Sequence, residues 1–187
     1  MSALTLELRA PRARLGLKGP QASEWLAENG IFLPTAPNTW SSPVQTGAGD
    51  ALLVARLGSS EFFLEDGASG TIVARLRPQL SGDPANVGAP PGVYPILRED
   101  AAFLLGGEGV HDVLAQVCNV NFATLALESR PVIMTLMIGV AVLVVPENPT
   151  AGRRYRIWCD PTFGPYLGES LGEVVLECGG RYTGVPE

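Results

Sequence analysis

The sequence contains few of the side chains on which metal binding and nucleophilic catalysis usually depend. Its 187 residues include one histidine, His111, and three cysteines, Cys118, Cys159 and Cys178. No pair of these has the spacing of about two to four residues with which a loop presents two ligands to zinc, so we expect no metal site. The cysteines are odd in number, lie far apart and follow no secretory signal, which argues against a disulfide framework. We therefore expect a protein of the reducing cytoplasm.

The single histidine also limits catalysis. A serine or cysteine nucleophile needs a base within hydrogen-bond reach, and the helical repeat places His111 on the side of its helix opposite Val110 and Leu114. We interpret His111 as a solvated surface residue. A pair of Cys118 with His111 on one helix face is the weaker alternative, because buried structural cysteines are far commoner than activated ones. We predict no catalytic residue in this chain.

Charge of either sign is scarce, and basic charge is the scarcer. Charged residues make up 17% of the chain, with 13 Lys and Arg against 19 Asp and Glu, a formal net charge of −6. No segment clusters basic residues with aromatics, so nucleic acid is not an expected partner. Hydrophobic residues make up 46% of the chain, which can cover a large core and leave apolar surface for a protein partner or for self-association of the isolated chain. We interpret the acidic pairs Glu65–Asp66 and Glu99–Asp100 as solvated charges at strand or hairpin ends.

The longest apolar run is too short for a membrane span. It extends from Val132 to Val145, whereas the hydrocarbon core of a bilayer needs roughly 20 residues of helix. Its β-branched residues and central Gly139 predict two buried strands that meet at a tight turn. Because both faces of this hairpin are apolar, we expect it to lie at the centre of the assembly or against another chain.

Two segments of the chain repeat one pattern of strand, glycine turn and helix. Shifting the sequence by 88 positions places Ala102–Cys118 over Arg14–Gly30. The apolar strand positions, a turn glycine and the buried helix face then coincide, in the pairs Leu15 and Phe103, Leu17 and Leu105, Gly19 and Gly107, Ala22 and Val110, Trp25 and Val113, and Leu26 and Leu114. A coincidence of three features predicts two diverged copies of one unit.

A second echo, at an offset of 81, follows each of these helices. It places residues 136–147 over residues 55–66, with Gly139 over Gly58, and predicts a strand, a glycine turn and a strand in each copy. The chain ahead of the first copy carries an alternating Leu4, Leu6 and Leu8, which is typical of an edge strand.

These patterns together predict an α+β fold. We expect one compact domain that spans residues 1–187, with repeat halves at about 14–80 and 102–176. A candidate helix follows each hairpin, at Thr71–Leu80 and at Thr162–Leu176. The breaker-rich residues 81–92 form the predicted linker between the halves.

The densest cluster of arginine and aromatic residues lies between Arg153 and Leu167. A strand that buries Tyr155, Ile157 and Cys159 ends at Asp160, which precedes Pro161 and is typical of a helix N-cap. The opposite face of this strand carries Arg154, Arg156 and Trp158. Exposed arginine and tryptophan are typical interface anchors, so we predict that these three contact a partner chain, ahead of the alternative that they bind an anionic cofactor.

Two stretches resemble a known family. They are Phe103–Phe122, in which Gln-Val-Cys-Asn-Val-Asn precedes Phe122, and Ile157–Leu171, which reads Ile-Trp-Cys-Asp-Pro-Thr-Phe-Gly-Pro-Tyr-Leu-Gly-Glu-Ser-Leu. With them the chain from Leu15 to Leu176 resembles the gamma subunit of heterotetrameric sarcosine oxidase. That family is similar to the folate-binding domain of aminomethyltransferase, the T protein of the glycine cleavage system. The resemblance implies two tandem ferredoxin-like halves packed together.

The resemblance also implies partners and cofactors. Gamma subunits of this family are accessory chains beside larger, alpha- and beta-type flavoprotein subunits. Those subunits hold FAD or FMN, NAD and tetrahydrofolate, and they oxidise N-methyl groups of sarcosine-like amines. The expected function is therefore that of a non-catalytic accessory subunit of an oxidoreductase complex, with no cofactor bound by this chain.

One departure from the related aminomethyltransferases concerns catalysis. Those enzymes carry a catalytic Asp in an Asp-Val-Ser-His-like stretch ahead of the strand that matches Ala102–Leu105, and here residues 93–100 read Val-Tyr-Pro-Ile-Leu-Arg-Glu-Asp, so the acid is not matched. The alternative function is a stand-alone folate-binding or aminomethyltransferase-like one-carbon protein, in which Tyr94, Arg98 and Asp100 line a changed pterin pocket. A third hypothesis, a small-molecule binding protein unrelated to amines, rests on the glycine turns and the arginine–tryptophan strand.

Overall fold

The chain divides into two compact units. The computed structural model describes residues 3–42, 52–80, 90–147 and 152–184, so most of the predicted linker, residues 81–89, lies outside the described residues. The first unit is Arg12–Arg98, and the second unit is Met1–Pro11 together with Glu99–Glu187. Each predicted repeat half falls within one unit. The chain returns to the second unit after Arg98, beyond the end of the predicted linker.

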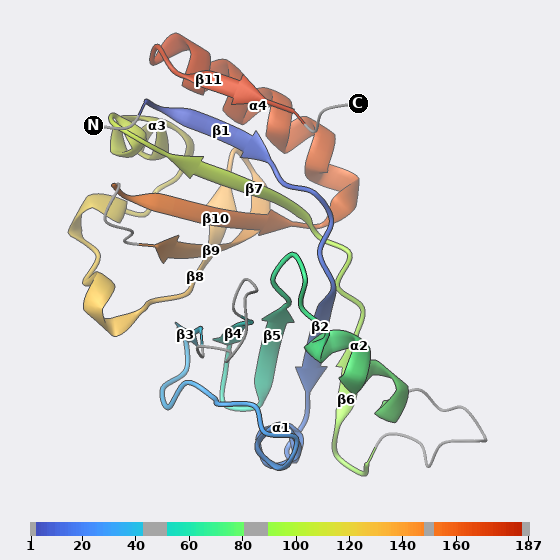
Figure 1. Cartoon of the computed structure of the whole chain (residues 1–187). Coiled ribbons are helices and arrows are strands. Elements are labelled where there is room, and N and C mark those ends of the chain that lie inside the picture. Colours follow the sequence, from blue (N-terminus) through green and yellow to red (C-terminus); the bar gives the residue numbers. More distant parts are fainter. Residues whose placement is uncertain (1–2, 43–51, 81–89, 148–151, 185–187) are drawn as a thin grey trace. The chain divides into compact units, whose positions relative to one another are not determined.

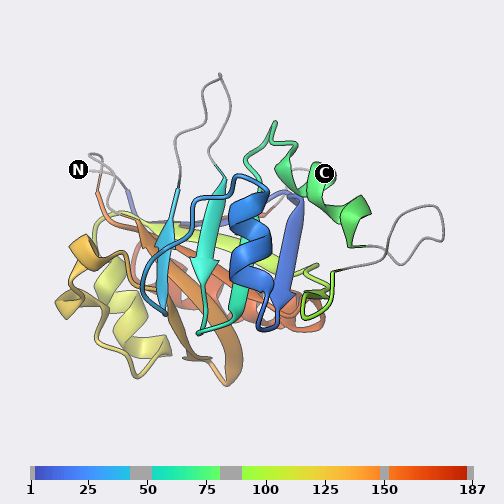
Figure 2. The same ribbon diagram turned by 90° about the horizontal axis from the view of Figure 1, so that it is seen from below.

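The first unit is built on a five-stranded antiparallel sheet. Its strand order is β3-β4-β5-β2-β6. The strands are β2 (Arg14–Lys18), β3 (Thr39–Ser41), β4 (Leu53–Arg56), β5 (Glu61–Glu65) and β6 (Tyr94–Ile96), and the helical segments are α1 (Ala22–Glu28), α2 (Ile72–Leu76) and η1 (Arg77–Gln79). As predicted, α1 buries Ala22, Trp25 and Leu26. Figure 2 shows α1 lying across one face of this sheet, where these side chains join Leu17 and Phe62 in the core.

The second unit is built on a six-stranded sheet of order β11-β1-β7-β10-β9-β8. The strands are β1 (Thr5–Leu8), β7 (Ala101–Gly106), β8 (Ile133–Met137), β9 (Val140–Glu147), β10 (Arg154–Cys159) and β11 (Arg181–Thr183). The helical segments are α3 (Val110–Val117), η2 (Phe122–Thr124), η3 (Leu127–Ser129), η4 (Pro161–Phe163) and α4 (Gly164–Glu177). The two α-helices cover one face of the sheet (Figure 1) and pack on a core that includes Phe103, Tyr155 and Ile157.

The expectation of an edge strand at the N-terminus was wrong. β1 lies inside the sheet, antiparallel to β7 on one side and parallel to β11 on the other (Figure 1). Leu4 and Leu6 are buried. An alternating pattern shows that one face of a strand is apolar, but it does not show how many neighbours the strand has.

The strand–turn–helix repeat takes the same form in both units. In the first unit α1 follows β2, and in the second unit α3 follows β7. The two pairs lie at the predicted offset along the chain. Gly19 and Gly107 both have a positive φ, +131° and +106°. A Cβ on Gly19 would lie 2.2 Å from the carbonyl oxygen of Gly92, and a Cβ on Gly107 would lie 2.1 Å from that of Ala3. Gly92 lies just ahead of β6 and Ala3 just ahead of β1, so in each unit the chain enters a strand beside the equivalent turn glycine.

The predicted correspondence of the two hairpins is shifted by one strand. The offset of 81 pairs β4 and β5 with β8 and β9. In the sheets, however, β5 is the neighbour of β2, and its counterpart beside β7 is β10. Glycine turns recur in antiparallel sheets, so a hairpin pattern alone does not identify which two strands are equivalent.

The helices that follow the sheets begin near their predicted positions. Thr71–Leu80 contains α2 and η1 with Pro78 at the break, and α4 ends one residue after Leu176. Asp160 caps η4 as predicted, since its side chain accepts a hydrogen bond from the Thr162 amide at 2.9 Å. Across the described ranges, no helix is both long enough and apolar enough to traverse a bilayer.

The Glu65–Asp66 pair is buried, and its interpretation as solvated charge was wrong. Asp66 is 1% exposed, and its Oδ2 accepts a hydrogen bond from the Val73 amide at 2.9 Å, at the start of α2. Its Oδ1 has no hydrogen-bond partner among the described residues. Burial raises the pKa of Asp66 above its ordinary value, although the amides of Val73 and Ile72 act in the opposite direction.

We predict that Gly107→Ala lowers the free energy of unfolding by at least about 2 kcal/mol, because the new Cβ adds overlap with Ala3 to an unfavourable φ. Gly139→Ala is the matched control. Gly139 also has a positive φ, of +79°, but nothing lies within 4 Å of its added Cβ, so we expect a loss of about 1 kcal/mol. Urea unfolding measures both variants, and equal losses would contradict the packing constraint at Gly107.

We predict that Asp66→Asn gains stability relative to the parent as the pH rises. The folded state binds the Asp66 proton more tightly than the unfolded state, so ionising Asp66 destabilises the fold from the unfolded pKa of 3.8 up through the raised native value. The asparagine of the variant does not titrate, and its side-chain oxygen can still accept from the Val73 amide. The measurement is the difference in free energy of unfolding between the two proteins from about pH 3 to pH 7, and a constant difference would contradict the raised pKa.

Candidate functional site

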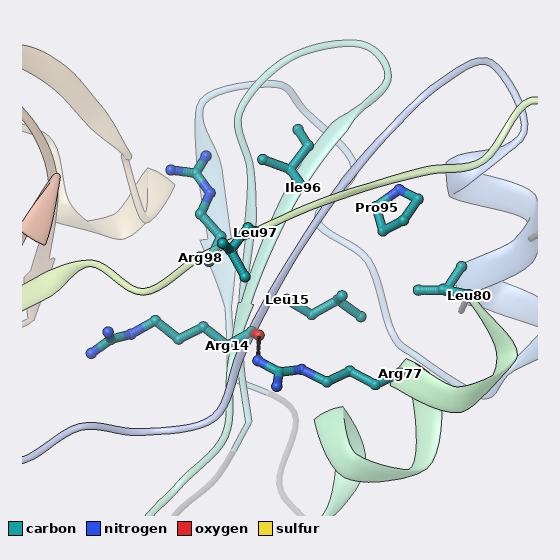
Figure 3. Close-up of a pocket in the computed structure, with 8 residues that line it drawn as sticks. All are labelled: Arg14, Leu15, Arg77, Leu80, Pro95, Ile96, Leu97 and Arg98. Carbon is teal, nitrogen blue, oxygen red and sulfur yellow. Dashed lines mark hydrogen bonds between the residues drawn. The ribbon is translucent and has the colours of Figure 1, made fainter. Parts of the chain in front are cut away.

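The first unit contains a cavity of about 380 Å³. Its lining comes from β2, from the first residue of η1 and the residue that follows η1, and from β6 with the residues after it (Figure 3). The residues are Arg14, Leu15, Arg77, Leu80, Pro95, Ile96, Leu97 and Arg98. The pairing of β6 with β2, which sets Pro95 opposite Leu17 and Ile96 opposite Gly16, holds these residues in place. Most of the wall is therefore apolar, and half of the lining residues belong to hydrogen-bonded strands.

Three arginines border the cavity, and two of them have acidic partners. Arg14 and Glu65 form a buried ion pair, with 2.5 Å between Nε and Oε2. These two residues face each other across the β2–β5 register. The Arg98 guanidinium lies 5.5 Å from the centre of the Phe63 ring and 3.9 Å from the Glu61 carboxylate. A buried ion pair such as that of Arg14 has little charge left to offer a ligand.

The third arginine, Arg77, is placed differently. Its Nη2 donates a hydrogen bond of 2.9 Å to the main-chain oxygen of Arg14 (Figure 3). No carboxylate pairs with it in the part of the chain that the structure describes. Among the described residues, the positive charge of Arg77 is therefore not compensated by a carboxylate, and it lies beside the apolar wall. No pattern in the sequence distinguishes Arg77, because it is a lone arginine after a short helix.

Of the three residues predicted to line a pterin pocket, only Arg98 lines the cavity. Tyr94 lies on β6 with an exposed side chain, and Asp100 belongs to the second unit. The structure therefore does not gather the three around this cavity. A role in pterin binding stays a prediction.

The predicted interface face of β10 is only partly exposed. Arg154 and Arg156 both approach Glu147 of β9, at 3.8 Å and 2.7 Å. Trp158 is 1% exposed, so its interpretation as an exposed anchor was wrong. Strand alternation correctly separated Trp158 from Tyr155, Ile157 and Cys159, but it could not show that its own face is covered.

His111 is part of a partly buried contact rather than a free surface residue, which corrects the interpretation as a solvated histidine. Its Nε2 lies 2.7 Å from the hydroxyl oxygen of Tyr155 and 3.3 Å from Nη1 of Arg153. Because the guanidinium can only donate, Nε2 holds the lone pair and Nδ1 carries the proton of the neutral ring. Burial lowers the pKa of His111, as does the positive charge of Arg153, while Asp112 acts in the opposite direction.

The cysteines do not complete a catalytic pair with His111. The Cys118 thiol lies 3.7 Å from the Thr135 hydroxyl and accepts from the Val120 amide. Burial raises the pKa of Cys159 to about 11, so this thiol stays protonated at neutral pH. The residues that contact His111 also hold η2 in place. Phe122 packs edge-on against Tyr155, and Arg153 donates to the Ala123 carbonyl.

We predict a pKa below 6.5 for His111 in the folded protein, and a higher value in Arg153→Gln, because the variant removes a nearby positive charge. Since the folded-state pKa is lowered, protonation opposes folding and stability falls as the pH drops through 6.5 towards the native pKa. An NMR titration reports this group without ambiguity, because the chain has one histidine. Arg154→Gln removes an equal charge paired with Glu147 and is the control. Equal pKa values in the two variants would contradict the assigned contact.

No protein-family model and no curated protein sequence matches this chain. Solved structures do match it. One is a chain of heterotetrameric sarcosine oxidase from Corynebacterium sp. U-96 in complex with pyrrole 2-carboxylate, with 22% identity and a TM-score of 0.67 over 93% of this chain and 84% of that one. Another is the glycine cleavage system aminomethyltransferase T from Bartonella henselae, with 16% identity and a TM-score of 0.62. This second match covers 97% of the present chain but only 48% of the aminomethyltransferase.

The resemblance inferred from Phe103–Phe122 and Ile157–Leu171 is thus confirmed at the level of the fold. The chain has a mixed α+β fold with two sheets, similar to that of a sarcosine oxidase chain and to about half of an aminomethyltransferase.

Proposed function

We propose that this chain is a non-catalytic, gamma-type accessory subunit of a flavin-dependent complex that resembles sarcosine oxidase. The similarity to a chain of a heterotetrameric sarcosine oxidase, which covers 93% of this chain and 84% of that one, supports this function. In this proposal the partners are larger alpha- and beta-type flavoprotein subunits in the cytoplasm. They hold FAD or FMN, NAD and tetrahydrofolate, and they oxidise an N-methyl amine.

The proposal includes a common origin of the two units as ferredoxin-like halves. The shared order β6-β2-β5-β4-β3 and β1-β7-β10-β9-β8 supports it. In both units the second strand of this order, β2 or β7, lies between two neighbours. On one side is β5 or β10, and on the other side is β6 or β1. β6 follows α2 along the chain, whereas β1 comes from residues 5–8.

The use of the reactive side chains supports an accessory role. His111 is engaged with Tyr155 and Arg153, and Cys118 with Thr135. Within the described ranges no group of three His, Cys, Asp or Glu residues could hold a metal ion. The single histidine and Cys118 are thus occupied in packing the second unit.

The single observation that carries the proposed assembly is the open edge of the six-stranded sheet, which is residues 133–136 of β8; the next residue, Met137, forms a bridge with Cys118. β8 is the last strand of that sheet, and its Met134 and Leu136 are 54% and 60% exposed. Edge strands of monomeric proteins usually carry charge or proline that prevents pairing with another chain. β8 reads Ile-Met-Thr-Leu-Met and carries neither. We assign this edge to a flavoprotein partner subunit, and the isolated chain can self-associate through it.

We predict that the tagged chain, purified from its native host, brings down larger chains whose absorbance spectrum is that of a flavin. Leu136→Lys places a charge on the open edge and is expected to reduce this recovery at least about tenfold. Leu176→Lys changes another exposed leucine, 58% exposed on α4, and is the matched control. A colourless single species from the unaltered chain would overturn the accessory function.

The similarity to an aminomethyltransferase over 97% of this chain supports the alternative function, a stand-alone folate-binding or aminomethyltransferase-like protein. A stand-alone folate-binding protein would gain stability from its ligand by mass action. Saturating tetrahydrofolate that leaves the melting temperature of the isolated chain unchanged would remove this alternative. A rise in melting temperature together with a colourless preparation would favour it over the accessory subunit.

A further inference from the structure

We propose that the cavity of the first unit binds a small organic anion in which one carboxylate is joined to a compact apolar body. Arg77 is the residue that binds the carboxylate, and the wall of Leu15, Leu80 and Ile96 receives the apolar body. This site lies within the first unit and does not depend on the proposed assembly.

The size and wall of the cavity suit a small ligand. Its volume of about 380 Å³ falls in the range of roughly 300 to 1,000 Å³ that is usual for small-molecule pockets. Leu15 and Leu80 are buried, and Pro95 and Ile96 belong to β6, which is fixed to β2 by strand pairing. A wall that is already formed favours binding, because little of it must be ordered when the ligand enters.

The charge around the cavity selects an anion. Among the described residues that line the cavity, none is an aspartate or a glutamate, whereas three are arginines. Arg14 is neutralised by Glu65, and Arg98 is close to both Glu61 and Phe63. Arg77 remains as the cation without an acidic partner among the described residues. A cationic ligand would therefore meet repulsion without a compensating carboxylate.

The geometry of Arg77 favours a carboxylate. A guanidinium has five N–H donors, and one of them is used on the Arg14 carbonyl oxygen, which also fixes the direction of the side chain (Figure 3). The remaining donors can form the paired hydrogen bonds with which arginine binds a planar carboxylate. One uncompensated cation matches one negative charge, so a singly charged carboxylate is a better match than a dianionic phosphate.

The test uses three probes of one shape and different charge: benzoate, benzyl alcohol and benzylamine. The chain is labelled at isoleucine and leucine methyl groups, and the Ile96, Leu80 and Leu15 signals report the cavity by NMR. Arg77→Gln keeps a donor for the Arg14 carbonyl and removes the charge. Arg75→Gln is the matched control, because Arg75 lies on α2 and donates to the Asn29 carbonyl without lining the cavity.

We expect benzoate to shift these methyl signals in a saturable manner and to bind more tightly than either other probe. Arg77→Gln should weaken benzoate about tenfold or more, the loss of a hydrogen bond to a charged group, and leave benzyl alcohol unchanged. Arg75→Gln should bind benzoate as the parent does. Arg77→Glu should reverse the order, so that benzylamine binds better than benzoate.

Three results would overturn the proposal. The first is that benzoate leaves the Ile96, Leu80 and Leu15 signals in place at saturating concentration. The second is that benzoate and benzylamine bind alike. The third is that Arg77→Gln and Arg75→Gln change benzoate binding equally, while the methyl spectra show that both variants are folded. None of these results bears on recovery of flavin-bearing chains, so failure of this site and failure of the proposed function are distinguishable.

Discussion

The glycine turn that joins β2 to α1 in one unit and β7 to α3 in the other is the constraint on which both units depend. At Gly19 and at Gly107 the main chain has a positive φ and a carbonyl oxygen occupies the space of a Cβ. The carbonyl belongs to the segment that leads into β6 in one unit and into β1 in the other. Because a sheet edge is open to any strand of suitable pattern, this close approach gives the incoming strand a defined place. The cavity of the first unit depends on it, since β6 supplies Pro95 and Ile96 to the wall.

The same constraint explains which parts of the fold could be predicted from the sequence. The strand–turn–helix repeat could be, because alternation, glycine and helical spacing are local and occur together in Arg14–Gly30 and again in Ala102–Cys118. The strand that pairs with β7 on the side away from β10 could not be predicted. β1 reaches β7 from about a hundred residues away along the chain, and no local pattern in Thr5–Leu8 distinguishes a central position from an edge. The hairpin correspondence failed for the same reason, since strand neighbours are a long-range property.

The burial of individual side chains is the other property that the sequence patterns did not predict. Alternation along β10 correctly assigned Tyr155, Ile157 and Cys159 to one face, but Trp158 on the opposite face is also buried. The position of Asp66 at a strand or hairpin end predicted a solvated charge, yet Asp66 is buried and accepts a hydrogen bond from the Val73 amide at the start of α2. His111 was assigned to the surface from its helical position. Its contact with Tyr155 joins α3 to β10, two elements whose proximity only the sheet order defines.

The candidate site shows what a ligand site needs beyond a pattern of residues. Arg98 was singled out in the sequence and does line the cavity, but its charge is shared with Glu61 and Phe63. Arg77 was overlooked, and it is the cation whose charge is not compensated in the described structure. Which arginine can bind a ligand is therefore decided by the positions of the carboxylates. In the second unit the arginines of β10 and the residue before it have partners: Glu147 receives Arg154 and Arg156, and Arg153 faces His111. The feature of that unit to which we assign recognition is the uncharged edge of β8, whereas the first unit offers a charge beside an apolar wall. An edge strand can recognise another polypeptide through its main chain, whereas a cavity of this size is typical of small-molecule sites. The partners proposed for the two units therefore differ in kind: a small anion for the first unit and a protein chain for the second.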